Sequence, residues 1–416
     1  MNALKRWDIF CKIVDNFGDI GVCWRLARQL QVEHDLQIRL WVDDLKSAQK
    51  IILSLNLNKN QQLIDNIAIF HWTELADFNQ AADVVIEAFA CDLPPTYLAS
   101  MSQKKSIWIN LEYLSAEPWV DDFHAKPSPQ SFLNSANGLT RHFYFPGFTE
   151  KTGGLIRETG ATKQYNRIQN RLHTSLPRKR EPILAMNSTW IPALAGMTEG
   201  EALKSKLQIS LFCYPNAPIS DLLDALQQYL LSPQNITAEA GYSYVKPNSH
   251  AVLVYVPQSN ILPNVAAFFG KKNIKAGDKL VKNNLTVEVL PFLSQAGYDQ
   301  LLRDCDINFV RGEDSWVRAI WAGKPFIWQP YMQDENAHMK KLDAFLNVFY
   351  GKNELACEAH RYWSTGLFPR ATLDAYLANL KHIHAYTQLQ AAKFANQQDL
   401  AAKLVIFCNK LAFTKE

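Results

Sequence analysis

Short apolar runs alternate with amphipathic segments through the first third of the chain. The apolar runs have the length of buried strands and lie at 7–14, 37–42, 67–70, 83–88 and 106–110. Between them, the segments 21–30 and 45–55 carry apolar residues at helical spacing. Strands and helices that alternate in this way build a parallel sheet covered on both faces, so we expect a doubly wound domain here.

The same alternation returns after about residue 205. Helical stretches again separate strand-like apolar runs, which lie at 209–214, 251–256, 286–290, 307–310 and 325–328. This pattern predicts a second doubly wound domain. Near the end of the chain, 372–380 and 389–411 are mostly helical in pattern, and we expect them to pack back across the first domain.

The composition changes abruptly between the two halves. A basic, proline-containing stretch at 176–182 leads into 187–198, which fits neither helical nor strand spacing. It resembles a translated bacterial intergenic repeat that entered the chain in frame, and an ordinary interdomain linker is the alternative. A surface loop tolerates such a segment at small entropic cost. In both cases we expect it to be mobile and not catalytic.

The length supports a division into two domains. A chain of 416 residues exceeds what one hydrophobic core usually organises. We therefore predict a Rossmann-like domain over 1–160, a linker or insertion over 161–204, and a second Rossmann-like domain over 205–384. A C-terminal helix at about 385–416 is expected to pack on the first domain.

Composition and charge exclude several function classes. Apolar residues make up 48% of the chain and charged residues 20%, which is typical of a globular protein. The 43 basic residues nearly balance the 40 acidic ones, and the net charge of +3 provides no overall field that would attract nucleic acid. Partners must therefore be selected by local sites.

The cysteines and the N-terminal residues indicate the compartment. Seven cysteines are scattered without a C-x-x-C pair, which favours a reduced, cytoplasmic chain without structural zinc. The first residues lack the apolar core and cleavage site of a signal peptide. No stretch approaches the ~20 apolar residues that would span a membrane. We expect a protein that is neither exported nor inserted.

Two aspartates lie in the turn that joins the first strand to the first helix. Asp15 and Asp19 are four residues apart and bracket Gly18, at the carboxyl edge of the predicted sheet, where open parallel sheets bind ligands. Two carboxylates so placed can converge on one nucleophile and accept its proton as it attacks. The structural alternative is that Asp19 only caps the helix while Asp15 ends the strand.

A second acidic turn occupies the equivalent place in the other half. The segment 306–319 reads as a buried strand, a glycine turn and a new helix, whose free N–H groups and Ser315 hydroxyl suit a diphosphate. Because acids repel phosphate, Glu313 or Asp314 should face sugar hydroxyls instead. The alternative is that the helix dipole alone favours acids here. An acidic turn after a strand occurs in both halves, and this repetition favours the functional interpretation. Two sheet edges would then face one cleft, as in GT-B glycosyltransferases.

Two aromatic residues lie in neighbouring loops. Phe292 occupies a strand-to-helix loop where it could stack on a base, with a plain core position as an equal alternative. Tyr331 follows the strand at 325–328, at the same sheet edge, where it could reach phosphate or sugar. Both side chains are therefore candidates for binding a nucleotide sugar.

Several segments together resemble one known family, the protein-arginine rhamnosyltransferases EarP. They are Asp-Asn-Phe-Gly-Asp-Ile-Gly at 15–21, Leu-Glu-Tyr-Leu-Ser-Ala-Glu at 111–117, Pro-Gly-Phe at 146–148, Arg-Gly-Glu-Asp-Ser at 311–315 and Gln-Pro-Tyr at 329–331. The resemblance spans nearly the whole chain in the same order, and only the segment near 176–200 departs from it.

The resemblance implies an inverting GT-B enzyme that transfers L-rhamnose from dTDP-β-L-rhamnose to an arginine of translation elongation factor P. That modification would activate the factor to relieve ribosome stalling at polyproline. The first domain would bind this protein acceptor and the second the nucleotide-sugar donor. No metal or cofactor is implied, which agrees with a helix N-terminus that serves the diphosphate. Membrane and nucleic acid are not expected as partners.

The resemblance also assigns roles to residues. Asp19 resembles the general base, Asp15 the companion acid that orients the guanidinium, and Glu313 a third essential carboxylate near the sugar. An attacking guanidinium has a pKa above 12, so one acid to hold it and another to accept a proton suit this chemistry. Candidates on the donor side are Tyr214, Phe292, Gln295, Arg311, Asp314, Ser315 and Tyr331. Candidates on the acceptor side are Asn16, Phe17 and Gly18.

Two other functions remain open. The same fold could serve another nucleotide-sugar transferase or an epimerase, and an epimerase would turn over sugar nucleotide without elongation factor P. A homologue that binds elongation factor P but is catalytically inactive is a further alternative. Intact Asp15, Asp19 and Glu313 argue against that alternative.

Overall fold

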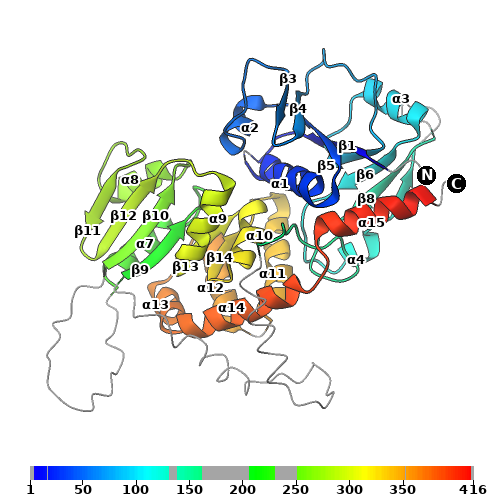
Figure 1. Ribbon diagram of the computed structural model, residues 1–416. Helices are drawn as coiled ribbons and strands as arrows, with labels where there is room; N and C mark the ends of the chain where they lie inside the picture. The colour runs from blue at the N-terminus through cyan, green and yellow to red at the C-terminus, as the bar shows by residue number, and fades with distance from the viewer. Residues whose placement is uncertain are drawn as a thin grey trace, which may run out of the picture.

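The computed structural model describes residues 4–15, 17–130, 138–161, 206–229, 251–351 and 353–413. Some of the predicted features lie outside the described residues. They are the acceptor-side residue Asn16 and most of the linker at 161–204, including the whole of 176–200. The strands of the described residues form two sheets, one in each half of the chain (Figure 1).

The first sheet is mainly parallel. Its strands run in the order β3-β4-β2-β1-β5-β6-β8-β7. They are β1 (Arg6–Cys11), β2 (Gln37–Val42), β3 (Gln61–Ile64), β4 (Ile67–His71), β5 (Val84–Ala88), β6 (Ile107–Leu111), β7 (Pro127–Pro129) and β8 (Thr140–Tyr144). Without the antiparallel edge strands β3 and β7, the order is that of a Rossmann fold. All five predicted strands of this half are present.

Helices cover this sheet because its central strands are apolar on both faces. In β1, Ile9 and its neighbour Phe10 belong to hydrophobic clusters on opposite sides of the sheet. The helices of this half are α1 (Gly18–His34), α2 (Leu45–Ile51), α3 (Pro95–Lys104) and α4 (Val120–Phe123). Helix α1 packs on β1 and β2, and its other side faces the second half of the molecule.

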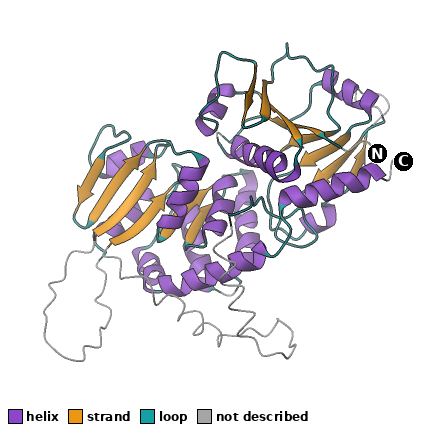
Figure 2. Ribbon diagram, in the orientation of Figure 1, coloured by secondary structure: helices purple, strands orange, loops and turns teal. Residues whose placement is uncertain are grey.

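The second sheet repeats the same plan. Its order is β11-β12-β10-β9-β13-β14, and only β11 is antiparallel to its neighbour. The strands are β9 (Lys206–Leu211), β10 (Ala251–Pro257), β11 (Lys279–Lys282), β12 (Leu285–Leu290), β13 (Ile307–Arg311) and β14 (Phe326–Gln329). Helices flank the strands (Figure 2), among them α7 (Ile219–Gln227), α8 (Leu262–Phe268), α9 (Gln295–Asp304) and α10 (Asp314–Ala322).

The chain ends in a series of helices. After the short 3-10 helix η3 (Asp334–Asn336) come α11 (Ala337–Phe349), α12 (Glu354–Thr365), α13 (Arg370–Ala378), α14 (Leu380–Ala395) and α15 (Leu400–Phe413). Helix α13 contacts α7 and helix α14 contacts α10, so the expectation that 372–380 packs across the first domain is wrong. Helix α15 returns to the first half (Figure 1), where it contacts α1 and β6. The ring of Phe407 on α15 lies against that of Tyr144.

Two sheets of this kind, with helix α1 of the first half packed against α10 of the second, make up the GT-B fold. The predicted fold class is therefore confirmed. The loop after β1 and the loop after β13 each follow the carboxyl end of a central strand. The contact between α1 and α10 brings these two loops together, because each helix begins where one of the loops ends.

Candidate active site

The first acidic turn is organised around Asp19. Its Oδ2 accepts hydrogen bonds from the backbone N–H groups of Val14 at 2.7 Å and Asp15 at 2.9 Å, and the Tyr113 hydroxyl donates to its Oδ1 at 3.2 Å. Asp19 lies within the first turn of α1, after the N-cap residue Phe17, and its carboxylate bonds back to the preceding loop, so Asp19 is not the helix cap. Burial raises the pKa of Asp19 above its usual value, although these hydrogen bonds oppose the shift.

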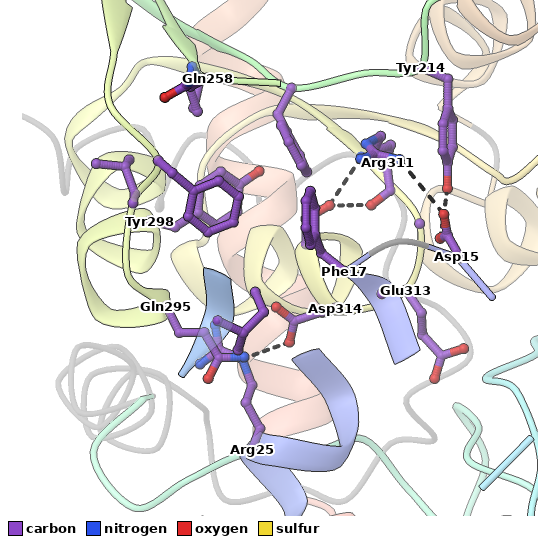
Figure 3. A pocket seen from close by; sticks show the side chains of 18 residues that line it. Asp15, Phe17, Arg25, Tyr214, Gln258, Gln295, Tyr298, Arg311, Glu313 and Asp314 are labelled. Carbon is purple, nitrogen blue, oxygen red and sulfur yellow. Dashed lines mark hydrogen bonds and ion pairs between the residues drawn. The ribbon is translucent and has the colours of Figure 1, made fainter. Parts of the chain in front are cut away.

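Asp15 connects the first half to the second. The Tyr214 hydroxyl donates to its Oδ2 at 3.0 Å, and a guanidinium nitrogen of Arg311 lies 3.8 Å from its Oδ1 (Figure 3). A Cβ at Gly18 would lie 2.9 Å from Oδ2 of Asp15. Any larger residue at position 18 would therefore displace this carboxylate.

The second acidic turn follows β13. Gly312 has a φ of +60°, which favours glycine, and Glu313 comes directly before α10. The Glu313 Oε2 accepts a hydrogen bond from the backbone N–H of Leu114 in the first half, at 2.9 Å. Burial raises the pKa of Glu313 to about 7, even though Lys341 favours its charged form. A carboxyl group of this kind can hold or release a proton near neutral pH.

Arg311 is fixed by aromatic side chains. Its guanidinium carbon lies 4.7 Å from the ring centroid of Phe212 and 4.4 Å from that of Tyr214, and the residue is buried. Its Nε is buried without a hydrogen-bond partner among the described residues. The cation therefore has donor capacity left for an anion in the adjoining pocket.

Ser315 and Asp314 are both engaged within the protein. The Ser315 hydroxyl accepts from the Arg311 N–H at 3.1 Å and donates to the Arg311 carbonyl oxygen. Asp314 points to the first half, where Nε of Arg25 donates to its Oδ1 at 2.6 Å (Figure 3). A role of either side chain in donor binding stays a prediction, and it would require these contacts to change.

A pocket rich in aromatic side chains adjoins the two turns. This aromatic pocket encloses about 660 Å³, including its open mouth. It is lined by Asp15, Phe17, Gly18, Arg25, Ile51, Phe212, Tyr214, Pro257, Gln258, Phe292, Leu293, Gln295, Tyr298, Arg311, Gly312, Glu313, Asp314 and Ser315. The rings of Phe292 and Phe17 meet edge to face, with their centroids 5.1 Å apart. Phe292 therefore lines the pocket and is not a plain core residue. The Gln295 Nε2 donates to the Gly21 carbonyl at 2.9 Å, which leaves its buried Oε1 without a partner among the described residues.

A second pocket lies on the other side of the same turns. This acidic pocket encloses about 880 Å³, including its open mouth. It is lined by Val14, Asp15, Gly18, Asp19, Val22, Phe89, Tyr113, Gly312, Glu313, Trp316, Trp328, Pro330, Tyr331, Gln333 and Lys341. The Tyr113 ring is stacked on Phe89 with centroids 4.3 Å apart. The two pockets share Asp15, Gly18, Gly312 and Glu313.

Most of the predicted site residues meet around these pockets. The three predicted catalytic carboxylates all line the acidic pocket, while Phe292, Gln295 and Arg311 line the aromatic one. Phe17, an acceptor-side candidate, lines the aromatic pocket, and Tyr331, a donor-side candidate, lines the acidic pocket with 52% of its surface exposed. The substrate that each of these two residues contacts stays a prediction.

Other residues of the site were not assigned from the sequence. Tyr113 follows β6 at the carboxyl edge of the sheet. Asp15 and Arg311 became candidates because ligands bind at this edge, and the same argument could have identified Tyr113. Lys341 lies within α11, and no local pattern distinguishes it from a surface lysine. Arg25 is likewise one of several polar residues along α1, and its role depends on contacts distant in sequence.

The chemistry available at the site is proton transfer and anion binding. Three carboxylates face one pocket, and a buried guanidinium and the N-terminus of α10 face the other. Within the described ranges, no cluster of three or more His, Cys, Asp or Glu side chains is arranged to hold a metal ion. Such an arrangement suits a group transfer from a donor with an anionic leaving group to a nucleophile that loses a proton.

Comparison with known proteins supports this assignment. The sequence matches the family described as Elongation-Factor P (EF-P) rhamnosyltransferase EarP over residues 7–409. The protein-arginine rhamnosyltransferase of Pseudomonas putida is 39% identical over 408 residues, which are 96% of this chain and 98% of that protein. The protein of the same name from Shewanella oneidensis is 37% identical over 426 residues, with 98% of both chains covered.

A solved structure also matches over the whole length. It was described in a study of the structural basis for EarP-mediated arginine glycosylation of translation elongation factor EF-P. It superposes with a TM-score of 0.58 at 29% sequence identity, and the match covers 97% of this chain and 99% of that one.

Proposed function

The chain belongs to the EarP family of elongation factor P rhamnosyltransferases, and we propose that it transfers L-rhamnose from dTDP-β-L-rhamnose to one arginine of elongation factor P, with inversion at the anomeric carbon. A protein-arginine rhamnosyltransferase needs a donor site and an acceptor site that meet at one reacting carbon. The observation that carries the proposal is that two pockets share Asp15 and Glu313 at their boundary.

The aromatic pocket suits the nucleotide. Phe292 and Phe17 supply ring faces and edges for a thymine base. The Gln295 Oε1, which has no partner within the described part of the chain, can accept a hydrogen bond from the base edge. The guanidinium of Arg311 and the N-terminus of α10 suit the diphosphate, since Nε of Arg311 bonds to no other described residue. As the bond between the anomeric carbon and phosphate breaks, these groups stabilise the charge that develops on dTDP, and no metal ion is needed for this task.

The acidic pocket suits the acceptor arginine. The guanidinium enters between Asp15 and Glu313, and the stacked rings of Tyr113 and Phe89 offer a surface for its side chain. Its nitrogen attacks the anomeric carbon and dTDP leaves with the bonding electron pair. The nitrogen then loses a proton to Asp19, which the raised pKa makes a better base than an exposed aspartate. Asp15 holds and orients the cation.

Mass spectrometry of elongation factor P tests this proposal. The factor is incubated with the enzyme and dTDP-β-L-rhamnose, and we expect the addition of one deoxyhexose to one arginine. The anomeric configuration of the product, measured by NMR, should be α, as inversion requires. A matched incubation with the Asp19→Asn variant should modify the factor at least about a hundredfold more slowly.

Two outcomes would point to the alternatives. Consumption or isomerisation of the sugar nucleotide without elongation factor P would indicate an epimerase. Binding of the factor without any modification would indicate an inactive homologue. Both outcomes contradict the proposed transfer.

The site of action follows from the acceptor. Because elongation factor P works in translation, we propose that the enzyme acts in the cytoplasm. Among the described helices, none is both long and apolar enough to cross a membrane.

A further inference from the structure

Two arginines and three acids form a buried ion-pair cluster between the two halves of the molecule, beside the reacting carboxylates. We call it the Arg25 cluster, and its members are Arg25, Glu158, Asp299, Asp314 and Arg318. Arg25 comes from α1 in the first half, whereas Asp299 lies on α9 in the second half. Its members connect the helix that follows the first acidic turn to the helix that follows the second.

Arg25 makes the central contacts. Its two terminal nitrogens donate to the two carboxylate oxygens of Asp299 at 3.1 Å and 2.9 Å, and its Nε donates to Asp314 at 2.6 Å. The Arg25 side chain is only 4% exposed. A planar guanidinium that binds a carboxylate through two parallel hydrogen bonds fixes direction as well as distance. The pairing therefore sets how α1 lies against α9 and α10.

The other members strengthen this arrangement. Arg318 binds the same two oxygens of Asp299, at 3.0 Å and 2.7 Å, and also donates to Glu158. Burial alone would raise the pKa of Glu158, but Arg318 and Arg25 outweigh this effect and lower it to about 2. Glu158 is therefore charged throughout the physiological pH range, and its ion pairs persist there.

The position of the cluster relates it to the reaction. Asp19 lies in the first turn of α1, and Glu313 directly precedes α10. Other contacts between the halves use the reacting groups themselves, such as Tyr214 to Asp15 and Leu114 to Glu313. Substrates that engage those carboxylates compete with such contacts. Although Arg25 and Asp314 also line the aromatic pocket, the Arg25 cluster includes none of the three carboxylates assigned to catalysis, so it can hold the halves together while those carboxylates react.

We propose that Arg25 is a positioning residue, which holds the acidic turn of the first half against Glu313 by tying α1 to α9 and α10. The activity part of this inference rests on the proposed rhamnosyl transfer. A displacement of about 1 Å between reacting groups can reduce a rate about a hundredfold, so a loosened contact should lower kcat.

Arg25→Gln and Arg39→Gln form a matched pair of variants. Arg39 also binds a buried carboxylate, because its Nε donates to Asp8 at 2.6 Å. Arg39 and Asp8 both belong to the first half, and neither of them lines a pocket of the site. We expect Arg25→Gln to lower kcat for transfer about a hundredfold. Arg39→Gln should keep kcat near the wild-type value, although it also loses a buried ion pair.

Distances between the halves provide a second readout that does not depend on activity. Spin labels at Asn58→Cys in the first half and Lys272→Cys in the second occupy exposed positions, and all seven native cysteines are buried. The distance distribution between the labels should broaden in Arg25→Gln and stay narrow in Arg39→Gln. If Arg25→Gln does not fold, Asp299→Asn removes charge from the same pairing and should broaden the distribution as well.

The results separate this inference from the proposed function. If the wild-type enzyme transfers no rhamnose, the proposed function fails, and the distance distributions still decide the role of Arg25. An unchanged distribution in Arg25→Gln, or an equal broadening in Arg39→Gln, would overturn the inference. So would a loss of activity in Arg25→Gln that comes entirely from weaker binding of thymidine diphosphate.

Discussion

At the scale of single residues, the shape of the first turn depends on Asp19. Its carboxylate accepts two backbone N–H groups of the preceding loop, so it stabilises the turn in addition to its proposed role as the base. An asparagine at this position retains one oxygen for these N–H groups but cannot accept the proton of the nucleophile. This difference allows structure and catalysis to be tested separately.

We therefore expect Asp19→Asn to reduce rhamnosyl transfer by about 10² to 10⁴-fold, with the affinity for dTDP-rhamnose unchanged within a few-fold. Transfer is measured by mass spectrometry and affinity by calorimetry. Asp43→Asn is the matched control, because Asp43 also accepts a backbone N–H of this loop, from Ile13 at 2.9 Å, but lines neither pocket. Near-normal transfer by Asp19→Asn would refute the assignment of the base.

Glu313 should make the stability of the protein depend on pH. Its pKa is raised from 4.5 to about 7 in the folded state, so between these values the folded protein binds a proton that the unfolded chain has released. The contribution of this group to stability is fully present below the unfolded pKa and is lost as pH rises through the folded pKa. A glutamine at this position does not titrate.

Urea unfolding of the wild type and Glu313→Gln at pH 5 and pH 8 measures this effect. The free energy of unfolding of the wild type, minus that of the variant, should fall by up to about 3 kcal/mol when the pH is raised from 5 to 8. The comparison with the variant removes the contribution of all other titrating groups. A difference that does not change with pH, or that rises, would show that Glu313 does not have a raised pKa.

At the scale of elements, the two halves are also joined where the C-terminal helices cross. Gly154 has a φ of +76°, and a Cβ there would lie 2.6 Å from the carbonyl oxygen of Gln398, in the connection between α14 and α15. Only glycine allows the two backbones to approach so closely. Helix α15 thus reaches α1 and β6 through a contact that leaves no room for a side chain.

Gly154→Ala should destabilise the protein more than Gly270→Ala. Gly270 also has a positive φ, of +63°, but a Cβ there would meet nothing within 4 Å, so that variant adds only backbone strain of about 1 to 2 kcal/mol. Gly154→Ala adds the same backbone strain and, in addition, a clash between the new Cβ and the carbonyl oxygen of Gln398. Urea unfolding of both variants measures the difference, and equal losses would mean that α15 does not dock tightly at this point.

At the scale of the whole molecule, the segment 177–198 tests how much of the chain the enzyme needs. This segment lies outside the described residues, and its composition fits neither strand nor helix. We expect its deletion to leave transfer to elongation factor P within about twofold of the wild type, because the length of a flexible connection changes the free energy of folding little in general. Transfer and thermal unfolding are measured together. A collapse in folding yield would show that the segment is structural.

The sequence by itself determined the local plan of both halves. Apolar runs predicted the central strands because a parallel strand covered on both faces needs apolar side chains on both faces. Acids in the turns that follow the strands at 7–14 and 307–310 were visible as candidates because ligands bind at the carboxyl edge of such sheets. The short antiparallel strand β7, Pro127–Pro129, was not predicted, since two of its three residues are proline.

Only the tertiary structure decided which of these side chains meet. Arg25 and Asp299 are separated by 274 positions along the chain, and Leu114 and Glu313 by 199, so no local pattern records that they are bonded. The placement of Phe17 in the aromatic pocket and of Tyr331 in the acidic pocket has the same origin. Periodicity reports which face of an element is buried, whereas the packing of one half against the other determines what that face contacts.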